Sequence, residues 1–196
     1  MPEPVFRAVL LFGAPGVGKG TQGQRLGRVP RFHHLSTGDM FRSLDKDSPL
    51  GKEVRSFTER GVLVPDELTV RIFRDAVHQR VAAGKYDPAR DTLVLDGIPR
   101  NVNQCRILER EIRVVRVLHL VSSDPEVMVT RMKKRAVLEG RKDDADEAVI
   151  RRRFDVYCRE TAPVLEYYPA NLVLEIDALG TPEEVAATIE RGLLDT

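Results

Sequence analysis

A glycine-rich segment, GAPGVGKGT at residues 13–21, constrains this chain more than any other feature. An apolar run at residues 5–12 leads straight into it, and a helical pattern with Gln22 and Leu26 follows. A strand, a glycine loop and a helix N-terminus in this order form a phosphate-binding loop, where backbone N–H groups surround an anion and Lys19 adds a positive charge. The alternative, a glycine-rich turn without a ligand, fits the flanking strand and helix poorly.

Further apolar runs rich in Val, Ile and Leu have the length of buried strands. They lie at residues 92–95, 114–121 and 172–176, with a weaker run at 32–35. Apolar side chains spaced one helical turn apart occur between them, at residues 50–57, 69–81 and 185–193. Strands that alternate with helices form parallel sheets. We therefore predict an α/β fold, a P-loop three-layer αβα sandwich with a central five-stranded parallel sheet.

Two helix starts are visible in the sequence. Asp124 precedes Pro125, which places a capping side chain before proline at the first helical position. The segment Thr181-Pro-Glu-Glu184 combines the same arrangement with a capping box. Helices are therefore expected to begin at residues 125 and 182.

The overall composition narrows the possible classes. A chain of 196 residues with 42% hydrophobic residues supports one core, so residues 1–196 are expected to form a single domain. A net charge of +1 favours neither nucleic acid nor a membrane surface as a partner. The first apolar run is too short to cross a bilayer, and it lacks a signal-peptide pattern. Cys105 and Cys158 have neither CxxC nor zinc-ligand spacing, which favours a reduced, cytoplasmic protein. The absence of an apolar heptad stripe makes a monomer the default expectation.

A second motif, VLDGIPR at residues 94–100, closes another predicted strand. Asp96 stands at the carboxyl end of that strand, where a carboxylate that organises Mg²⁺ belongs; a helix cap or turn is the alternative. Gly97 and Pro99 form a tight turn that aims Arg100, although an arginine taken alone is more often a surface residue.

Four sequence blocks occur in one order along the chain: GAPGVGKGT, STGDMFR at 36–42, GVLVPDE at 61–67 and LDGIPR at 95–100. A fifth, RETAPVLEYY, follows at 159–168. With these blocks the chain resembles the adenylate kinase family over nearly its whole length. The resemblance implies a helical insert at 36–65 that binds the nucleoside monophosphate and a short lid at 134–144. In the general phosphate-loop motif Ser or Thr follows the lysine directly, whereas Gly20 intervenes here. The GKGT form is that of nucleoside monophosphate kinases, in which Mg²⁺ is held largely through water.

The resemblance also implies an ATP site and an AMP site. The ATP residues would be Gly16, Val17, Gly18, Lys19, Gly20, Thr21, Arg131, Arg135 and Gly180, with Arg131 stacked on the adenine. The AMP residues would be Thr37, Arg42, Val62, Leu63, Val64, Gly97, Ile98, Pro99, Arg100, Gln104, Arg141 and Arg153. The catalytic cations would be Lys19, Arg100, Arg135, Arg141 and Arg153, with Asp96 holding Mg²⁺ through water.

Two positions discriminate between acceptor bases. Pyrimidine monophosphate kinases of this superfamily carry Ala and Asn where this chain has Thr37 and Gln104. A glutamine amide both donates and accepts, as an adenine edge requires; without this context Gln104 would be a solvated helix residue. Ile98 departs from the family's DGFPR pattern, which removes an aromatic surface expected beside the monophosphate.

Only AVLEG separates Arg135 from Arg141, so the lid is expected to be a loop without a structural zinc site. One extra residue follows the lid. Counting forward from Asp144 selects Arg152 as the next site arginine, whereas counting back from the 159–168 block selects Arg153, which we prefer. A solvated basic helix face is the alternative for residues 151–153.

The predicted function is reversible, Mg²⁺-dependent phosphoryl transfer, ATP + AMP = 2 ADP. A UMP/CMP or other nucleoside monophosphate kinase is the first alternative. A non-catalytic ATP-binding regulatory module is the second, which the full set of arginines disfavours. His33, His34, His78 and His119 belong to no motif, and we interpret them as structural.

Overall fold

The computed structural model describes residues 6–141 and 144–194. Five parallel strands form one sheet in the order β2-β3-β1-β4-β5. The strands are β1 Phe6–Phe12, β2 Phe32–Ser36, β3 Thr92–Asp96, β4 Ile112–Val121 and β5 Val173–Asp177. All five predicted strands are confirmed, with ends that move by at most two residues; Val5, the first residue of the predicted first run, lies outside the described part.

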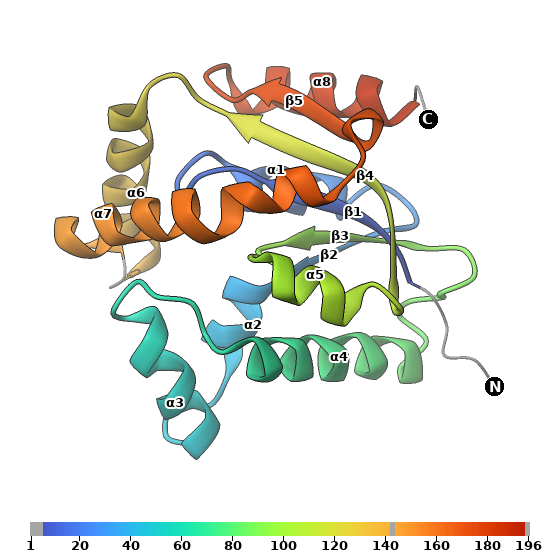
Figure 1. Ribbon diagram of the computed structural model, residues 1–196, viewed down its shortest axis with the longest axis horizontal. Coiled ribbons are helices and arrows are strands. Elements are labelled where there is room, and N and C mark those ends of the chain that lie inside the picture. The colour runs from blue at the N-terminus through green and yellow to red at the C-terminus, as the bar shows by residue number, and fades with distance from the viewer. Residues whose placement is uncertain (1–5, 142–143, 195–196) are drawn as a thin grey trace.

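Helices cover both faces of this sheet and its carboxyl edge (Figure 1). They are α1 Lys19–Leu26, α2 Thr37–Ser43, α3 Pro49–Thr58, α4 Asp66–Ala82, α5 Val102–Leu108, α6 Pro125–Glu139, α7 Glu147–Val156 and α8 Pro182–Leu194. A π-helical turn, η2 Tyr157–Thr161, and two 3₁₀ turns, η3 Ala162–Tyr167 and η4 Ala170–Leu172, connect α7 to β5. The predicted three-layer α/β architecture is confirmed.

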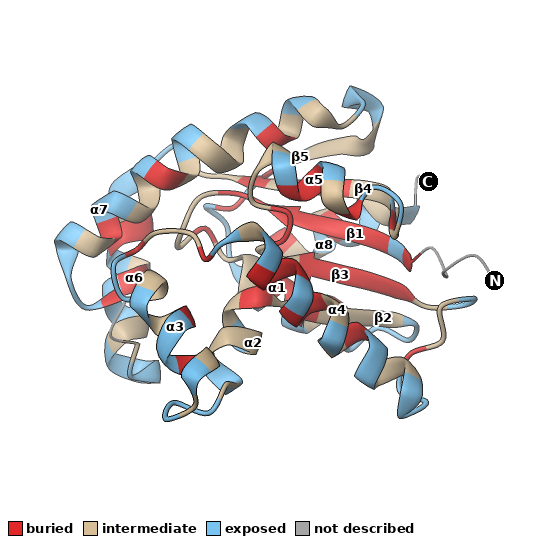
Figure 2. Cartoon of the chain, turned by 60° about the horizontal axis from the view of Figure 1, so that its bottom comes forward, coloured by how far each residue is buried: buried red, intermediate tan, exposed pale blue. Residues whose placement is uncertain are grey.

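The core consists of two main clusters, one on each side of the sheet. Alternate side chains of a strand point to opposite faces, so Leu10 of β1 joins one cluster while Val9 and Leu11 join the other. Helix α4 lies over the first face, and α1 and α8 contact each other over the second. Figure 2 shows β1 and β3 buried between these layers. The buried sheet therefore provides a rigid base for the loops at its carboxyl edge.

Local capping signals fix where the helices start. The Asp124 carboxylate accepts hydrogen bonds from the backbone N–H groups of Glu126 and Val127. Thr181 and Glu184 form the reciprocal bonds of a capping box at the start of α8. Both predicted helix starts are confirmed.

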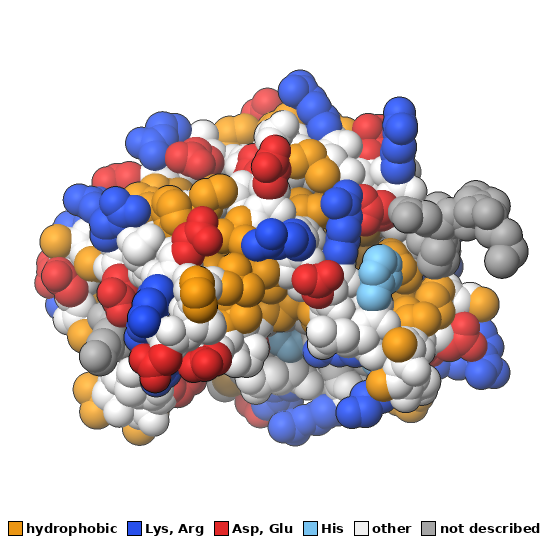
Figure 3. Space-filling model, turned by 90° about the horizontal axis from the view of Figure 1, so that it is seen from below, with side chains coloured by type: hydrophobic (Ala, Val, Ile, Leu, Met, Phe, Trp, Pro, Cys, Tyr) orange, Lys and Arg blue, Asp and Glu red, His pale blue; other side chains and the backbone are white. Residues whose placement is uncertain are grey.

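Surface charge is mixed in sign, in keeping with the net charge of +1. On the face shown in Figure 3, basic and acidic side chains are interspersed. Both cysteines, Cys105 and Cys158, are free thiols. Within the described residues, no helix combines the length and the apolar character needed to cross a membrane.

Candidate active site

The glycine loop runs from the end of β1 into α1, and its glycines are required by geometry. Gly13 has a φ of 140°, and a Cβ placed there would lie 2.3 Å from the Leu120 carbonyl oxygen. At Gly16, with a φ of 81°, a Cβ would lie 2.6 Å from the Met128 carbonyl oxygen. The loop therefore packs directly against the backbones of β4 and α6, which only glycine permits.

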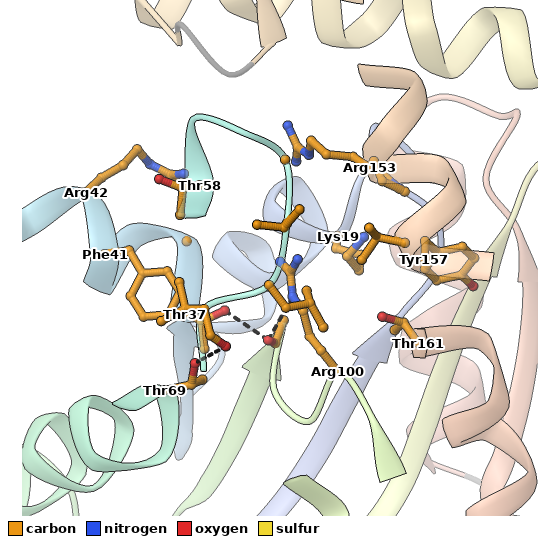
Figure 4. A pocket seen from close by; sticks show the side chains of 18 of the residues that line it. Lys19, Thr37, Phe41, Arg42, Thr58, Thr69, Arg100, Arg153, Tyr157 and Thr161 are labelled. Carbon is orange, nitrogen blue, oxygen red and sulfur yellow. Dashed lines mark hydrogen bonds between the residues drawn. The ribbon is translucent and has the colours of Figure 1, made fainter. Parts of the chain in front are cut away.

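A cavity of about 430 Å³ opens next to this loop, between the sheet edge, the α2–α3 insert and the α6–α7 region. Twelve predicted site residues line it: Lys19, Thr37, Arg42, Val62, Leu63, Val64, Gly97, Pro99, Arg100, Gln104, Arg141 and Arg153. Figure 4 shows Lys19, Arg100 and Arg153 pointing into the same space from three different elements. The structure thus brings together the predicted AMP residues with the exception of Ile98.

Ile98 lies in the main core cluster and is 1% exposed. Its side chain lies in the core and not in the cavity. The replacement of the family's Phe by Ile therefore changes core packing and not the surface beside the monophosphate. The same turn contains a cis peptide bond between Ile98 and Pro99.

Lys19 lies at the centre of the cationic groups. Its Nζ donates to the carbonyl oxygens of Gly13 at 2.7 Å and Ala14 at 3.0 Å. Although part of the residue remains accessible, the ammonium group is enclosed by protein, and this burial lowers its pKa to about 8. Asp96 opposes the shift, while the positive charges of Arg100, Arg153 and Arg135 add to it. Cations from three distant segments therefore lie close enough to Lys19 to affect its pKa.

Asp144 holds two of these arginines. Its carboxylate is completely buried. Arg135 of α6 donates to Oδ2 from Nε at 2.7 Å, and Arg153 of α7 pairs with Oδ1. One carboxylate thereby aligns guanidinium groups from two helices. In the sequence, Asp144 was only the position from which Arg152 was counted, and this role was not predicted.

The two candidate arginines of α7 separate clearly in the structure. Arg153 lines the cavity, whereas Arg152 is exposed and donates to the Arg60 carbonyl oxygen at 3.3 Å. Arg151 pairs with Glu147 on the outer surface. The backward count, which selected Arg153, agrees with this placement.

Thr37 and Arg100 meet at the turn after β3. The Thr37 hydroxyl donates to the Gly97 carbonyl oxygen at 3.0 Å, and Arg100 Nε donates to the same oxygen at 3.0 Å. Gly97 has a φ of 83°, and a Cβ there would lie 2.5 Å from the Thr37 hydroxyl. The close approach of α2 to this turn therefore requires glycine.

The Gln104 amide is held in one orientation although it lines the cavity. Its Oε1 accepts the Arg100 backbone N–H at 2.7 Å, and its Nε2 donates to Asp66 at 2.8 Å. Asp66 also accepts from Asn101 at 2.8 Å and Asn103 at 2.7 Å. Burial raises the pKa of Asp66, but these three hydrogen bonds outweigh it and the pKa is lowered overall. A charged Asp66 thus fixes which end of the amide accepts and which donates.

The remaining predicted ATP residues, Gly16, Val17, Gly18, Gly20, Thr21, Arg131, Arg135 and Gly180, do not line this cavity. Arg131 of α6 donates to the Ala178 carbonyl oxygen at 3.1 Å, which brings it to the loop that carries Gly180. Gly18, Gly20 and the exposed Thr21 belong to the loop and to the first turn of α1. The predicted adenine-binding residues and the predicted phosphate-binding residues of the ATP site therefore both lie on the side of the sheet that α1 covers.

The predicted loop at the lid is corrected by the structure. Residues 134–139 continue α6, which ends at Gly140 with a φ of 63°. Ala, Val, Leu and Glu sustain the helix until glycine in the left-handed region stops it. Arg141 then pairs with Glu139 at 2.7 Å, and burial, Arg135 and Arg42 lower the pKa of its guanidinium. Residues 142–143 of the predicted lid lie outside the described residues.

Asp96 provides a carboxylate next to the loop. Its Oδ2 lies 3.8 Å from where a Cβ on Gly20 would stand. Within residues 6–141 and 144–194, no group of three or more His, Cys, Asp and Glu side chains could hold a metal ion. A single carboxylate fits Mg²⁺, which keeps several waters and binds through substrate phosphates.

Several lining residues were absent from the predicted site set, among them Phe41, Thr58, Tyr157 and Thr161. Tyr157 and Thr161 are labelled in Figure 4 beside Lys19. The Tyr157 hydroxyl lies 3.4 Å from His119 Nε2. Tyr157 and Thr161 belong to the π-helical turn η2, whose residue spacing differs from the α-helical period of the sequence patterns.

Comparison with known proteins agrees with this geometry. Residues 11–173 match the family model described as adenylate kinase. Adenylate kinase of Thermus thermophilus is 42% identical over 196 residues, covering 96% of this chain and 98% of the relative. Adenylate kinase of a Nocardioides species is 37% identical, covering 94% of this chain and 96% of the relative. Adenylate kinase of Flavobacterium johnsoniae is 37% identical, covering 90% and 93% respectively. The chain has a phosphate loop with arginines in the adjoining cavity, and it matches these relatives over almost their whole length. It therefore belongs to the adenylate kinase family.

Proposed function

We propose that the chain transfers the terminal phosphoryl group of ATP to AMP in a reversible reaction that yields two ADP. The observation that carries the proposal is the convergence of Lys19, Arg100 and Arg153 on one cavity beside the phosphate loop. The proposed ATP, AMP and catalytic residues are those predicted from the sequence, to which we add Asp144 as the residue that positions two arginines. We further propose a cytoplasmic monomer.

The reaction needs no general base. The attacking AMP phosphate oxygen is already ionised, the bond between the γ-phosphorus and the bridging oxygen breaks, and the electron pair leaves on the ADP oxygen. Catalysis then depends on in-line positioning and on positive charge arranged before the reaction. Lys19, Arg42 and Arg100 approach from the loop and AMP sides, and Arg135, Arg141 and Arg153 from the lid side.

Mg²⁺, oriented by Asp96 through water, would supply additional neutralisation of the phosphate charge. The chain itself has to exclude water, which competes with AMP as acceptor. We propose that residues 36–65 close over AMP and residues 134–144 over ATP, a type of lid closure for which adenylate kinases are a known example.

The acceptor base is tested by a coupled assay with AMP, CMP, UMP and GMP. We expect AMP to react fastest, because Thr37 and a Gln104 with fixed donor and acceptor ends are both present. Faster turnover of CMP or UMP would favour the pyrimidine kinase alternative. Tight ATP binding without turnover of any acceptor would favour the regulatory alternative.

The neighbouring arginines of α7 provide a matched test of the phosphate clamp. Arg153→Ala is expected to lower kcat by a factor on the order of 10² to 10³, as for other lost transition-state donors. Arg152→Ala is expected to leave kcat within about twofold of wild type, because surface substitutions have small effects. Thermal melting checks that both variants fold. The reverse order of the two effects would contradict the assignment of Arg153.

The lowered pKa of Lys19 predicts a loss of activity in alkaline solution. The protonated ammonium is the form that attracts phosphate, so kcat/KM for ATP should fall once the pH rises above the free-enzyme pKa of about 8. The ATP phosphates are already ionised at this pH, so the decline reports on the enzyme. A pH profile from 6.5 to 10 measures it, and a constant kcat/KM up to pH 10 would be inconsistent with a buried lysine here.

Asp66→Asn tests how the base is read. The new amide presents a donor to groups that themselves donate, so Gln104 loses its fixed orientation. We expect kcat/KM for AMP to fall about tenfold, as for the loss of a charged hydrogen bond, and the preference for AMP over CMP to narrow, with KM for ATP unchanged. Glu67→Gln, at the next and exposed position of α4, is the matched control. Equal effects of the two substitutions would refute the role of Asp66.

A further inference from the structure

A second concave site lies away from the candidate active site. It is an open groove of about 610 Å³, lined by the end of α1, the turn at residues 27–31, β2 and the last part of α4. None of its lining residues lines the catalytic cavity. It adjoins β2 from the amino end, whereas the catalytic cavity adjoins the carboxyl ends of the strands. We call it the β2 groove.

The β2 groove is strongly basic. Its lining contains Arg28, Arg31, Arg80, His33 and His34 and no acidic residue. His33 is paired with Asp91 across a distance of 3.0 Å, but Arg28, Arg31 and Arg80 form no ion pair with any described residue. By contrast, Arg25 and Arg42, which flank the groove in sequence, are paired with carboxylates.

Arg80 is the least usual of these groups. It is partly buried, and burial lowers the pKa of its guanidinium without an acidic neighbour to compensate. Burial lowers the pKa of the nearby His34 imidazole, an effect that Asp96 and Asp39 oppose and Arg80 reinforces, and His34 Nε2 is buried without a hydrogen-bond partner. A desolvated charge is normally paired or hydrogen-bonded, so a negatively charged ligand would relieve this arrangement.

The backbone of the turn that carries Arg28 and Arg31 is fixed by hydrogen bonds. Arg31 has a φ of 69° and is, within the described ranges, the one non-glycine residue with a positive φ. Its carbonyl oxygen accepts the Thr92 N–H at 2.8 Å, and Phe32 N–H donates to the Val29 carbonyl oxygen at 3.1 Å. Such a conformation persists where the surroundings over-determine it. The groove is therefore bordered by a fixed turn.

Helix capping does not account for these arginines. The final carbonyl oxygens of α1, those of Gly23, Arg25 and Leu26, already accept backbone N–H groups from residues 27–29. The side chains of Arg28 and Arg31 are thus not required as helix caps and remain available to a ligand.

We propose that the β2 groove binds a chain of linked phosphate groups, as found in inorganic polyphosphates and nucleoside polyphosphates. Guanidinium groups bind phosphate oxygens through paired hydrogen bonds. Three of them, from the turn and from α4, suit a ligand with several phosphates better than a single carboxylate. Three arginines and no acidic residue in the lining favour an anion over a cation. This site is separate from the proposed phosphoryl transfer.

The test uses the full-length protein with its catalytic cleft saturated by a dinucleotide of two adenosines joined by five phosphates. Equilibrium dialysis then measures retention of inorganic tripolyphosphate and, in a second arm, ATP. We expect the chain to retain about one tripolyphosphate at low salt, bound as tightly as ATP within about threefold, since the phosphates carry the recognition. No retention, or retention of ATP alone, would overturn the proposal.

Matched variants locate the binding. Arg80→Gln and Arg28→Gln are each expected to weaken tripolyphosphate binding about tenfold, as for a lost charge-assisted pair. Arg71→Gln, an exposed arginine on the same helix α4 but outside the groove, is expected to change it by less than about twofold. Turnover of ATP and AMP should stay at the wild-type rate in all three variants, so failure of this proposal and failure of the proposed function are distinguishable. Equal weakening by Arg71→Gln would show that binding depends only on the total charge of the protein, and it would refute a defined site.

Discussion

The buried carboxylate of Asp144 is the contact on which the candidate site most depends. A fully buried carboxylate is unfavourable unless opposite charges surround it, and here two guanidinium groups do so. Since Arg135 comes from α6 and Arg153 from α7, this contact also sets how the two helices face each other across the cavity. The carboxylate reduces the mutual repulsion of the two arginines. The three groups together still carry one net positive charge, which attracts phosphate.

The other cations are held in the same manner, each by an acceptor of the protein itself. Lys19 donates to two carbonyl oxygens, Arg42 to Asp39 and Arg141 to Glu139. Such contacts fix direction before any phosphate is bound, which is the condition for electrostatic catalysis without reorganisation. Neutral carbonyl oxygens are weaker acceptors than phosphate oxygens. The positions of these charges are therefore set by the fold, and Lys19, whose two acceptors are neutral, remains available to a substrate phosphate.

Local rules made most of the fold predictable. Buried parallel strands are continuous apolar runs, and β2 gave the weakest run because His33 and His34 interrupt its apolar residues. The arginines were recognised because the phosphate motifs surround them. Asp144 could not be recognised as an organiser, since its role depends on α6 and α7 meeting in space. Tyr157 and Thr161 were missed because a π-helical turn departs from the period of 3.6 residues. The lid was predicted as a loop because only five residues separate Arg135 from Arg141, although most of these residues continue helix α6.

The order of the sequence blocks has a physical origin in contacts between them. Thr37 from the second block touches the Gly97 carbonyl of the fourth, and Asp66 from the third holds Gln104 just beyond the fourth. Residues that are separate motifs in the sequence are thus one hydrogen-bonded unit in the folded chain. A base-reading amide is useful only if its two ends cannot exchange places. In the proposed function, selectivity at Gln104 would therefore depend on a carboxylate 38 residues earlier as much as on the glutamine itself.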